Sequence, residues 1–364
     1  MVNRSLSMEA GRPQLRFRNL PESFGVKNSR GVTAVRFDQG FSNISSPGKA
    51  TIWIADSSMR INDFLSKTVS VWIDADESHK NLDGVHRLCE SLSELGCTRS
   101  TMLVAVGGGV VQDIVTMTAG IFMRGVEWTF IPTTTNSALD SCLGGKSAIN
   151  LGSHKNALGN FHPPSSVVIN TTLLDTLDQD NYLGGVFEGV KICFAAGPEA
   201  FESFCDELEA QNFRVTPTLV DLSLRSKKVF IEEDEFDTGV RLLLNFGHTF
   251  GHALEAASDF QVPHGVAVAV GMLAACKWSE IDTPETKRLI RVIDMLLSER
   301  EQNSISINWD IFEWAFARDK KNTGEEFRII APAGTGLAVV SILKSEEALK
   351  RFSSIMKSET ERYV

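Results

Sequence analysis

Short apolar runs recur through the first half of the chain, and longer stretches with helical character fill the second half. The runs predicted as strands are 32–37, 50–55, 69–73, 102–106, 128–131 and 166–169, with helical stretches predicted at 81–95 and 114–122. Because strands alternate with helices here, the pattern predicts a parallel sheet in an α/β domain. Further along, the predicted elements are almost all helices, at 185–194, 199–210, 216–232, 242–257, 265–280 and 284–298.

This change of pattern near Asp178 predicts a domain boundary. A chain of 364 residues is too long for one ordinary core, so two domains are expected. We predict an N-terminal arm at 1–30, an α/β nucleotide-binding domain at 31–177 and an all-α domain at 178–364.

Charge and composition narrow the class of partner. The net charge of −10, without a basic run, argues against nucleic acid and anionic membrane as partners. No apolar run is long enough to span a bilayer, and the polar first residues lack the apolar segment of a signal peptide. The six cysteines are scattered without a Cys-x-x-Cys pair, which predicts reduced thiols in a cytoplasmic protein.

A glycine-rich turn, Gly107 to Gly109, follows one predicted strand directly and opens a helix. Glycine lets the backbone approach a ligand, and the helix N-terminus offers free N–H groups to a phosphate. The spacing is not Gly-x-Gly-x-x-Gly, so a tight strand-to-helix turn is an equally good interpretation. In the loop-like sequence that follows, Lys146 and Lys155 belong either to a solvated loop or to an anion-binding pocket.

Three of the seven histidines, His248, His252 and His264, lie close together in the second half. Imidazole is the commonest metal ligand in proteins. His248 and His252 are four residues apart in a predicted helix, so they project from one face. Glu188, one turn before Lys191, is either half of a solvated ion pair or a buried carboxylate that holds a cation. These ligand types suit zinc with an open coordination position, and spacing favours His248 and His252 with Glu188 or His264 as third ligand.

Several short motifs occur in a fixed order. They are Gly107-Gly-Gly-Val-Val-x-Asp113, Phe122-Met-Arg-Gly125, Ile131-Pro-Thr-Thr134, Asp140-Ser-x-x-Gly-Gly-Lys146, Lys155-Asn156, Glu188-x-x-Lys191, Arg241-x-x-x-Asn245-x-Gly-His-Thr-Phe-Gly-His252 and His264-Gly265. The ordered set resembles the sugar-phosphate cyclase superfamily, most closely the 3-dehydroquinate synthase family, from about residue 52 to residue 321.

The resemblance implies a role for each matching residue. Zinc, or alternatively cobalt, would be held by Glu188, His248 and His264, which makes His252 a substrate contact instead of a ligand. NAD would contact Asp56, Glu77, Lys80, Gly108, Gly109, Val110, Asp113, Thr133 and Thr134. The catalytic set would be Lys146, Lys191, Lys227, Arg241, Asn245 and His252. Further substrate and phosphate contacts would be Arg124, Asp140, Lys155, Asn156 and Lys321, with Lys321 preferred over Lys320 and Arg124 reaching across a homodimer interface.

The resemblance also implies a reaction. An NAD- and zinc-dependent lyase of this kind oxidises one carbinol of a seven-carbon ketose phosphate, eliminates phosphate, returns the hydride and closes a carbocycle by an aldol step. Because Arg241 suits a carboxylate, the expected substrate is 3-deoxy-arabino-heptulosonate 7-phosphate and the product 3-dehydroquinate. Alternatives are another cyclase, of the amino-dehydroquinate, sedoheptulose 7-phosphate or deoxy-inosose type, a metal-dependent alcohol dehydrogenase of the same fold, or a non-catalytic paralogue.

Two departures from the family pattern concern the site. Val266 stands where the family usually has a glutamate, two residues after a histidine ligand, so a partner of the metal ligands could be missing. Gln112 stands where the family usually has glycine, which predicts crowding of the cofactor.

Overall fold

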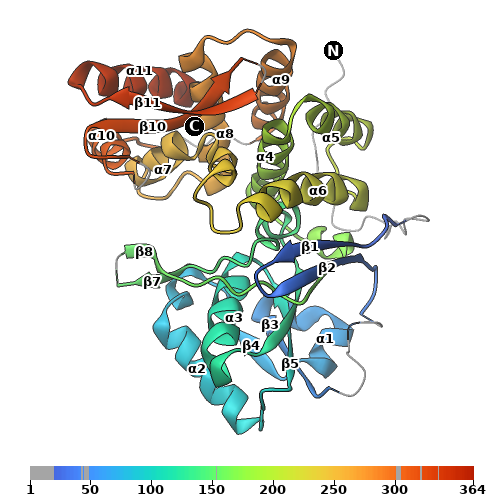
Figure 1. Ribbon diagram of the computed structural model, residues 1–364. Coiled ribbons are helices and arrows are strands. Elements are labelled where there is room, and N and C mark those ends of the chain that lie inside the picture. Colours follow the sequence, from blue (N-terminus) through green and yellow to red (C-terminus); the bar gives the residue numbers. More distant parts are fainter. Residues whose placement is uncertain are drawn as a thin grey trace. The chain divides into compact units, whose positions relative to one another are not determined.

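Over the residues that the structure describes, the chain crosses between two units three times. The computed structural model describes residues 20–41, 44, 49–152, 154–300, 305–319, 322–334 and 336–364. The N-terminal unit contains the described chain up to Leu177 and the segment Val215–Phe236, and the C-terminal unit contains Asp178–Arg214 and Asp237–Val364 (Figure 1). The segment Val215–Phe236, which we predicted within the helical domain, therefore groups with the α/β unit.

A mainly parallel sheet forms the centre of the N-terminal unit. Its described strands run in the order β1-β2-β9-β6-β5-β3-β4. Their bounds are Phe24–Asn28 for β1, Gly31–Phe37 for β2, Thr51–Asp56 for β3, Val71–Ile73 for β4, Met102–Gly107 for β5, Glu127–Pro132 for β6 and Ser166–Ile169 for β9. Among these described strands, only β1 is antiparallel to its neighbour. Strand β1 lies inside the segment predicted as an arm, whose first 19 residues lie outside the described part.

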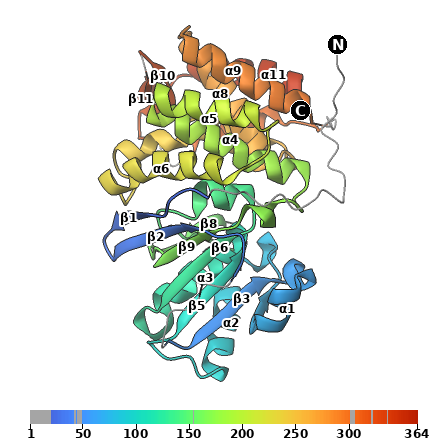
Figure 2. The ribbon, with the colours of Figure 1, turned by 90° about the vertical axis from the view of Figure 1, so that its right-hand side faces the viewer.

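Helices cover both faces of this sheet. The described helices of this unit are η1 (Ser57–Ile61), α1 (Asp63–Thr68), η2 (Glu77–His79), α2 (Leu82–Glu94), α3 (Gly109–Ile121), η3 (Phe122–Arg124), η4 (Ser137–Ser141), η5 (Thr171–Leu174) and α6 (Pro217–Glu233), and the unit also contains a small hairpin of β7 (Ile149–Leu151) and β8 (His154–Leu158). Because strand residues alternate between faces, Trp53 and Ala55 pack with Leu65 of α1, whereas Ile54 faces the opposite side. Helices α2 and α3 lie on that opposite side (Figures 1 and 2).

Helix α6 is held to the rest of the N-terminal unit by polar contacts far apart in sequence. Ser223 Oγ donates a hydrogen bond to the Leu139 carbonyl at 2.7 Å, and Glu232 accepts one from the Lys27 backbone N–H at 2.8 Å. The Arg225 guanidinium lies 4.4 Å from the centre of the Phe24 ring. These contacts explain why α6 belongs with the sheet although it follows two helices of the other unit.

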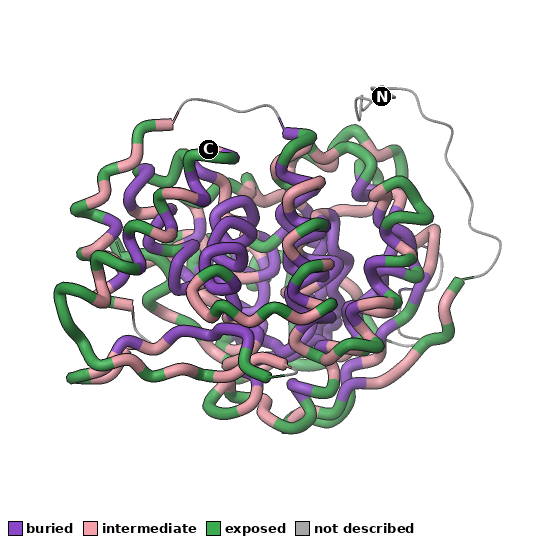
Figure 3. Tube along the Cα trace, turned by 90° about the horizontal axis from the view of Figure 1, so that it is seen from above, coloured by how far each residue is buried: buried purple, intermediate pink, exposed green. Residues whose placement is uncertain are grey.

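The C-terminal unit is mostly helical. Its elements are α4 (Gln179–Ala196), α5 (Pro198–Ala210), η6 (Val240–Asn245), α7 (His248–Ala257), α8 (His264–Ser279), α9 (Pro284–Ser298), α10 (Trp309–Ala317), the antiparallel pair β10 (Glu326–Ala333) and β11 (Gly336–Leu343), and α11 (Glu346–Tyr363). Helix α8 is buried from Gly265 to Cys276, and Figure 3 shows the buried stretches gathered in the interior helices. Among the described residues, no helix has both the length and the apolar character that a membrane crossing requires.

Helix α7 begins later than predicted. The sequence pattern predicts a helix from residue 242, but a short 3₁₀ helix ends at Asn245 and Gly247 adopts the left-handed conformation at φ 78°. That conformation breaks the helix, because residues other than glycine adopt it only with strain. His248 is therefore the first residue of α7. Behind it, Phe250 packs against Phe316 and Phe352, which fixes the opposite face of the helix in an aromatic cluster.

Candidate functional site

Three helices of the C-terminal unit bring Glu188, His248 and His264 together. Glu188 comes from the middle of α4, and the two histidines are the first residues of α7 and α8. The Nε2 atoms of His248 and His264 lie 3.7 and 3.6 Å from Glu188 Oε1, and all three ligand atoms lie within 4.8 Å of one another. Two imidazoles and one carboxylate in this arrangement are a donor set for a divalent ion such as Zn²⁺.

The carboxylate at the centre of this cluster is buried and incompletely satisfied. Glu188 is 2% exposed, and its Oε2 accepts a hydrogen bond from the buried Lys191 ammonium. Its Oε1 accepts no hydrogen bond from any described residue. A buried polar atom without a partner costs free energy, and a cation beside Oε1 would remove that cost. The residues present therefore fit a metal ion.

Charge in the cluster is consistent with this fit. Burial alone would raise the pKa of Glu188, but the Lys191 ammonium and the His264 ring together lower it below its usual range. Burial would likewise lower the pKa of His264, but Glu188 and Glu255 raise it above its usual range. A metal ion at His264 Nε2 would thus take the place of a proton.

Close approach of helix backbones at glycines sets the position of these ligands. A Cβ atom on Gly265 would stand 2.1 Å from the Gly184 Cα atom, which lies one turn before Glu188. A Cβ atom on Gly271 would stand 2.2 Å from the Gly247 carbonyl oxygen, which immediately precedes His248. Only glycine allows such contacts, because no real Cβ atom comes so near.

His252 lies beside the cluster instead of completing it. Its ring centre is 5.3 Å from that of His248 and 5.8 Å from that of His264, and its side chain is exposed. The sequence spacing favoured His248 and His252 as the metal pair, and these two side chains are indeed neighbours on one helix face. Glu188 Oε1, however, faces His248 and His264. Glu255, which the sequence analysis did not identify, contacts His264 Nδ1 at 3.2 Å. Its signal was available, because position 255 lies seven residues after His248 on the same helix face.

The remaining site residues predicted in the C-terminal unit lie on η6 or outside the described part. Arg241 is 4% exposed, and Asn245 donates a hydrogen bond to the Leu242 carbonyl at 3.1 Å. Lys321 and the alternative Lys320 lie outside the described residues. Val266 is fully buried, so apolar packing replaces the carboxylate usual in the family.

In the N-terminal unit, the glycine turn stands where the strand order changes direction. Strand β3 pairs with β4 on one side and β5 on the other, so the carboxyl ends of β3 and β5 meet at a topological switch point, the usual ligand site of such sheets. Asp56 ends β3, and Gly107 ends β5.

The turn itself leaves the start of α3 open. Gly108 precedes α3 with no side-chain cap on the helix, and a Cβ atom on exposed Gly109 would meet nothing within 4 Å. A Cβ atom on Gly108 would stand 2.7 Å from Thr134 Cγ2, so this backbone passes close to the Thr133–Thr134 segment. Uncapped N–H groups at an accessible helix start suit a phosphate.

A polar network next to this turn joins predicted nucleotide and substrate residues. Lys80 Nζ lies 3.2 Å from Asp113 Oδ2, 2.8 Å from Asn156 Oδ1 and 3.4 Å from Glu77 Oε1. Burial raises the pKa of Asp113 to about 6, although the Lys80 charge and the Ala148 backbone N–H lower it. The β7–β8 hairpin thereby places Asn156 among the residues predicted to bind NAD.

A second buried lysine holds the turn that follows β6. Lys227 of α6, 5% exposed, donates hydrogen bonds to the carbonyls of Asp140 at 2.6 Å and Leu143 at 3.0 Å. It also lies 2.7 Å from Asp140 Oδ1. Gln112 reaches the same turn: its Nε2 donates to the Ser141 carbonyl at 2.7 Å, and its Oε1 accepts from Ser141 Oγ at 2.7 Å. The Gln112 side chain is therefore held by two hydrogen bonds to Ser141 of η4.

The other predicted residues of this unit lie nearer the surface. Lys146 is half-buried and forms an isolated bridge to Phe161, and Lys155 is exposed on β8. Arg124 is exposed and has a left-handed backbone at φ 63°, next to exposed Met123 at φ 49°.

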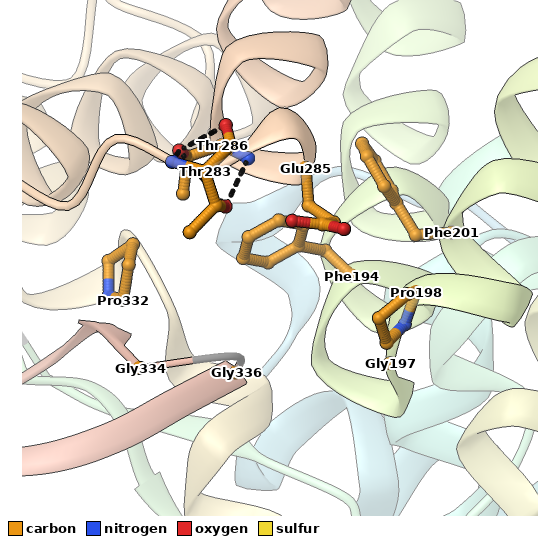
Figure 4. A pocket seen from close by; sticks show the side chains of 10 residues that line it. All are labelled: Phe194, Gly197, Pro198, Phe201, Thr283, Glu285, Thr286, Pro332, Gly334 and Gly336. Atoms are coloured by element: carbon orange, nitrogen blue, oxygen red, sulfur yellow. Dashed lines mark hydrogen bonds between the residues drawn. The ribbon is translucent and has the colours of Figure 1, made fainter.

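A small pocket of the C-terminal unit plays no part in this site. It lies between the starts of α5 and α9 and the turn from the end of β10 to the start of β11, where Thr283 and Thr286 cap α9 (Figure 4). Its volume of about 10 Å³ holds about one water molecule, and none of its lining residues is a predicted site residue.

Comparison with known proteins agrees with this fold. Two family models match, 3-dehydroquinate synthase N-terminal over residues 70–183 and 3-dehydroquinate synthase C-terminal over residues 185–322. The 3-dehydroquinate synthase of Thermoanaerobacter pseudethanolicus is 35% identical over 289 residues, which cover 76% of this chain and 80% of that protein.

Two solved structures are similar to the chain in fold. One is 2-deoxy-scyllo-inosose synthase complexed with carbaglucose-6-phosphate, NAD⁺ and Co²⁺, with a TM-score of 0.78, 22% identity and coverage of 92% of this chain and 100% of that one. The other is 2-epi-5-epi-valiolone synthase from Streptomyces hygroscopicus with NAD⁺ and Zn²⁺ bound, with a TM-score of 0.73, 22% identity and coverage of 96% and 100%.

Fold and sequence together define the chain as a carbon–oxygen lyase of the sugar-phosphate cyclase type. Within that class, it belongs to the 3-dehydroquinate synthase family. The predicted family and fold class are thereby confirmed.

Proposed function

We propose that the protein is an NAD- and divalent-metal-dependent cyclase that converts 3-deoxy-arabino-heptulosonate 7-phosphate to 3-dehydroquinate with loss of phosphate. The observation that carries the proposal is the buried Glu188 Oε1 atom in a chain of this family. This oxygen accepts no hydrogen bond from the described residues and lies 3.7 and 3.6 Å from the Nε2 atoms of His248 and His264. The relatives named 3-dehydroquinate synthase support this substrate over those of other cyclases.

Glu188, His248 and His264 would hold the metal. When bound, Zn²⁺ or Co²⁺ supplies Lewis acidity to the oxygen of the reacting carbinol or carbonyl. Three protein ligands leave a coordination position open, as a catalytic site requires. Lys191 keeps the second Glu188 oxygen paired, so that the carboxylate stays ionised and oriented.

The start of α3 would hold NAD. When bound, NAD supplies the acceptor and later the donor of one hydride, and no net NADH accumulates. Gly108, Gly109 and Val110 would present backbone N–H groups to its pyrophosphate. Thr133 and Thr134 lie beside this turn, and Asp56 ends the neighbouring strand β3.

Further charged and polar side chains would bind groups of the substrate. The planar Arg241 guanidinium suits the carboxylate of a heptulosonate through two parallel hydrogen bonds. His252 is exposed beside the metal cluster and would donate to the departing phosphate. Lys227 and Gln112 fix the Asp140 turn, so Asp140 would be presented in one conformation.

A coupled assay tests this proposal. The protein would be incubated with NAD, Zn²⁺ or Co²⁺ and 3-deoxy-arabino-heptulosonate 7-phosphate, and both inorganic phosphate and NADH would be measured. Phosphate release without net NADH is expected. Stoichiometric NADH without phosphate would identify a dehydrogenase instead. Parallel reactions with sedoheptulose 7-phosphate and glucose 6-phosphate distinguish the other cyclases, and no turnover on any of them with metal and NAD bound would indicate a non-catalytic paralogue.

Two further expectations remain predictions, namely the homodimer with Arg124 at its interface and the cytoplasmic location. Sedimentation of Arg124→Glu against the unchanged protein would test the first.

A further inference from the structure

Both histidines of the metal cluster use their second ring nitrogen in the same way. His248 Nδ1 lies 3.3 Å from the Phe246 carbonyl oxygen, and His264 Nδ1 lies 3.2 Å from Glu255 Oε2. A carbonyl oxygen can only accept, so His248 Nδ1 must carry the proton in that hydrogen bond. Its Nε2 lone pair is then left for a metal. The chain therefore presents one metal ligand whose tautomer is fixed by an acceptor behind the ring.

Glu255 repeats this arrangement behind His264. A carboxylate is a stronger acceptor than a carbonyl, so it favours the tautomer with the proton on Nδ1 and directs Nε2 toward Glu188. The first turn of α8 reads His-Gly-Val-Ala, so it contains no carboxylate that could take this place. The acceptor instead comes from the neighbouring helix α7, which also supplies the ligand His248.

The difference in exposure shows why His264 needs such a partner. The His248 side chain is 13% exposed, whereas the His264 side chain is 39% exposed. A ring that open to water has room to rotate, and only directed contacts fix its orientation. Glu255 is 15% exposed and its helix is pressed against α8, because a Cβ atom on Gly251 would stand 3.0 Å from the Ala267 carbonyl.

We infer that Glu255 is a positioning residue, whose carboxylate holds the His264 ring in the tautomer and orientation that bind a divalent metal. The inference depends on the metal part of the proposed function. Glu255 would touch neither substrate nor metal. It also forms a second possible ligand group with His252 and His264. If both groups held an ion at once, the same His264 ring would have to bind two ions, one at each nitrogen and without a ring proton.

Metal binding to purified, metal-free protein tests the role directly. Binding of Co²⁺ is measured by titration and by visible absorption, for the unchanged protein, Glu255→Gln, Glu255→Ala and His264→Ala. Glu280→Gln is a matched control, because it alters a carboxylate of the same unit. The Glu280 side chain is 78% exposed, and its ion pair with Arg351 lies at the surface. Thermal unfolding of each metal-free variant reports whether the fold is retained.

We expect one Co²⁺ per chain in the unchanged protein and in Glu280→Gln. Glu255→Ala should bind it about 10- to 100-fold more weakly and with an altered absorption spectrum. Glu255→Gln should bind Co²⁺ with an affinity between those of the unchanged protein and Glu255→Ala, because its amide oxygen still accepts a hydrogen bond from His264 Nδ1. The unfolding temperatures of the metal-free variants should change little. A structural defect would instead weaken metal binding in Glu255→Gln and Glu255→Ala alike.

Equal affinity and spectrum in Glu255→Ala would overturn the inference, as would no metal binding by the unchanged protein. Two ions per chain, with the second lost in Glu255→Gln, would overturn it as well, since Glu255 would then be a ligand. Failure of the proposed function gives a different result: the unchanged protein binds Co²⁺ and responds to Glu255 as described, but releases no phosphate from any sugar phosphate.

Discussion

Replacing Asp113 by asparagine is expected to stabilise the NAD-free protein at neutral pH. The carboxyl group is 19% exposed and its pKa is raised by burial from 3.8 to about 6, with Lys80 only partly compensating. A raised carboxyl pKa means that the folded state favours the protonated form. The stability associated with protonated Asp113 is therefore fully present below pH 3.8 and is lost as the pH rises through about 6.

The size of this effect follows from the same pKa values. Each pKa unit corresponds to about 1.4 kcal/mol, so the change from 3.8 to about 6 corresponds to at most about 3 kcal/mol at pH 7. Asparagine is neutral at every pH and still offers an acceptor to the Ala148 backbone N–H, which lies 3.1 Å from Oδ1. Asp113→Asn should gain stability over the unchanged protein by an amount that grows from near zero at pH 4 to at most about 3 kcal/mol at pH 7.

Urea unfolding between pH 4 and pH 8, followed by fluorescence without NAD or metal, measures the difference. Asp282→Asn is the control, because Asp282 is 72% exposed and its pair with Lys287 lies at the surface. It should change stability by less than about 0.5 kcal/mol at every pH. A difference between Asp113→Asn and the unchanged protein that is constant with pH, or a destabilised variant at pH 7, would refute the reasoning.

Three further outcomes follow from the structure. Gly271→Ala should lower stability by about 1–3 kcal/mol in thermal unfolding, because its Cβ would stand 2.2 Å from the Gly247 carbonyl; Gly324→Ala, with nothing within 4 Å, should be nearly neutral, and equal effects would contradict the packing argument. Lys227→Met should lower stability by about 3–5 kcal/mol in urea, since it removes a buried cation from Asp140, and a loss below about 1 kcal/mol would show that the turn does not depend on this lysine. A chelator should lower the melting temperature and added Zn²⁺ should restore it, because free metal at 100 times its Kd stabilises the folded protein by about 2.7 kcal/mol; an unchanged melting temperature would count against the metal site.

The sheet of the N-terminal unit was predictable, because buried parallel strands are continuous apolar runs. Strand β5, Met102–Gly107, is buried at every position, and so is β9, Ser166–Ile169. Strand β8 was not predicted, since its sequence His-Lys-Asn-Ala-Leu is mostly exposed and has no apolar pattern. The pair β10 and β11 was missed as well, since β11 alternates between half-buried and exposed residues.

The candidate site was predictable in its members more than in its geometry. Residue type and spacing identified Glu188 and the histidines, but spacing alone favoured His252 because it considers one helix at a time. The positions of Glu188 and His264 depend on contacts between helices, such as the approach of Gly265 to Gly184, which local sequence does not encode. For Glu255, the sequence shows that it shares a helix face with His248, but its contact with His264 joins two helices and is not encoded locally.

The return of α6 to the sheet has a consequence for how this protein is made. During translation, residues 178–214 leave the ribosome before α6, although they belong to the other unit. The Asp140 turn must wait for Lys227, so the N-terminal unit cannot complete its fold until about residue 236 has been synthesised. A fragment ending at Leu177 would lack α6 and would expose the surface of η4 and β1 that this helix contacts. Neither unit is therefore a contiguous cassette that could be cut out, exchanged between relatives or expressed alone by truncation at a single point.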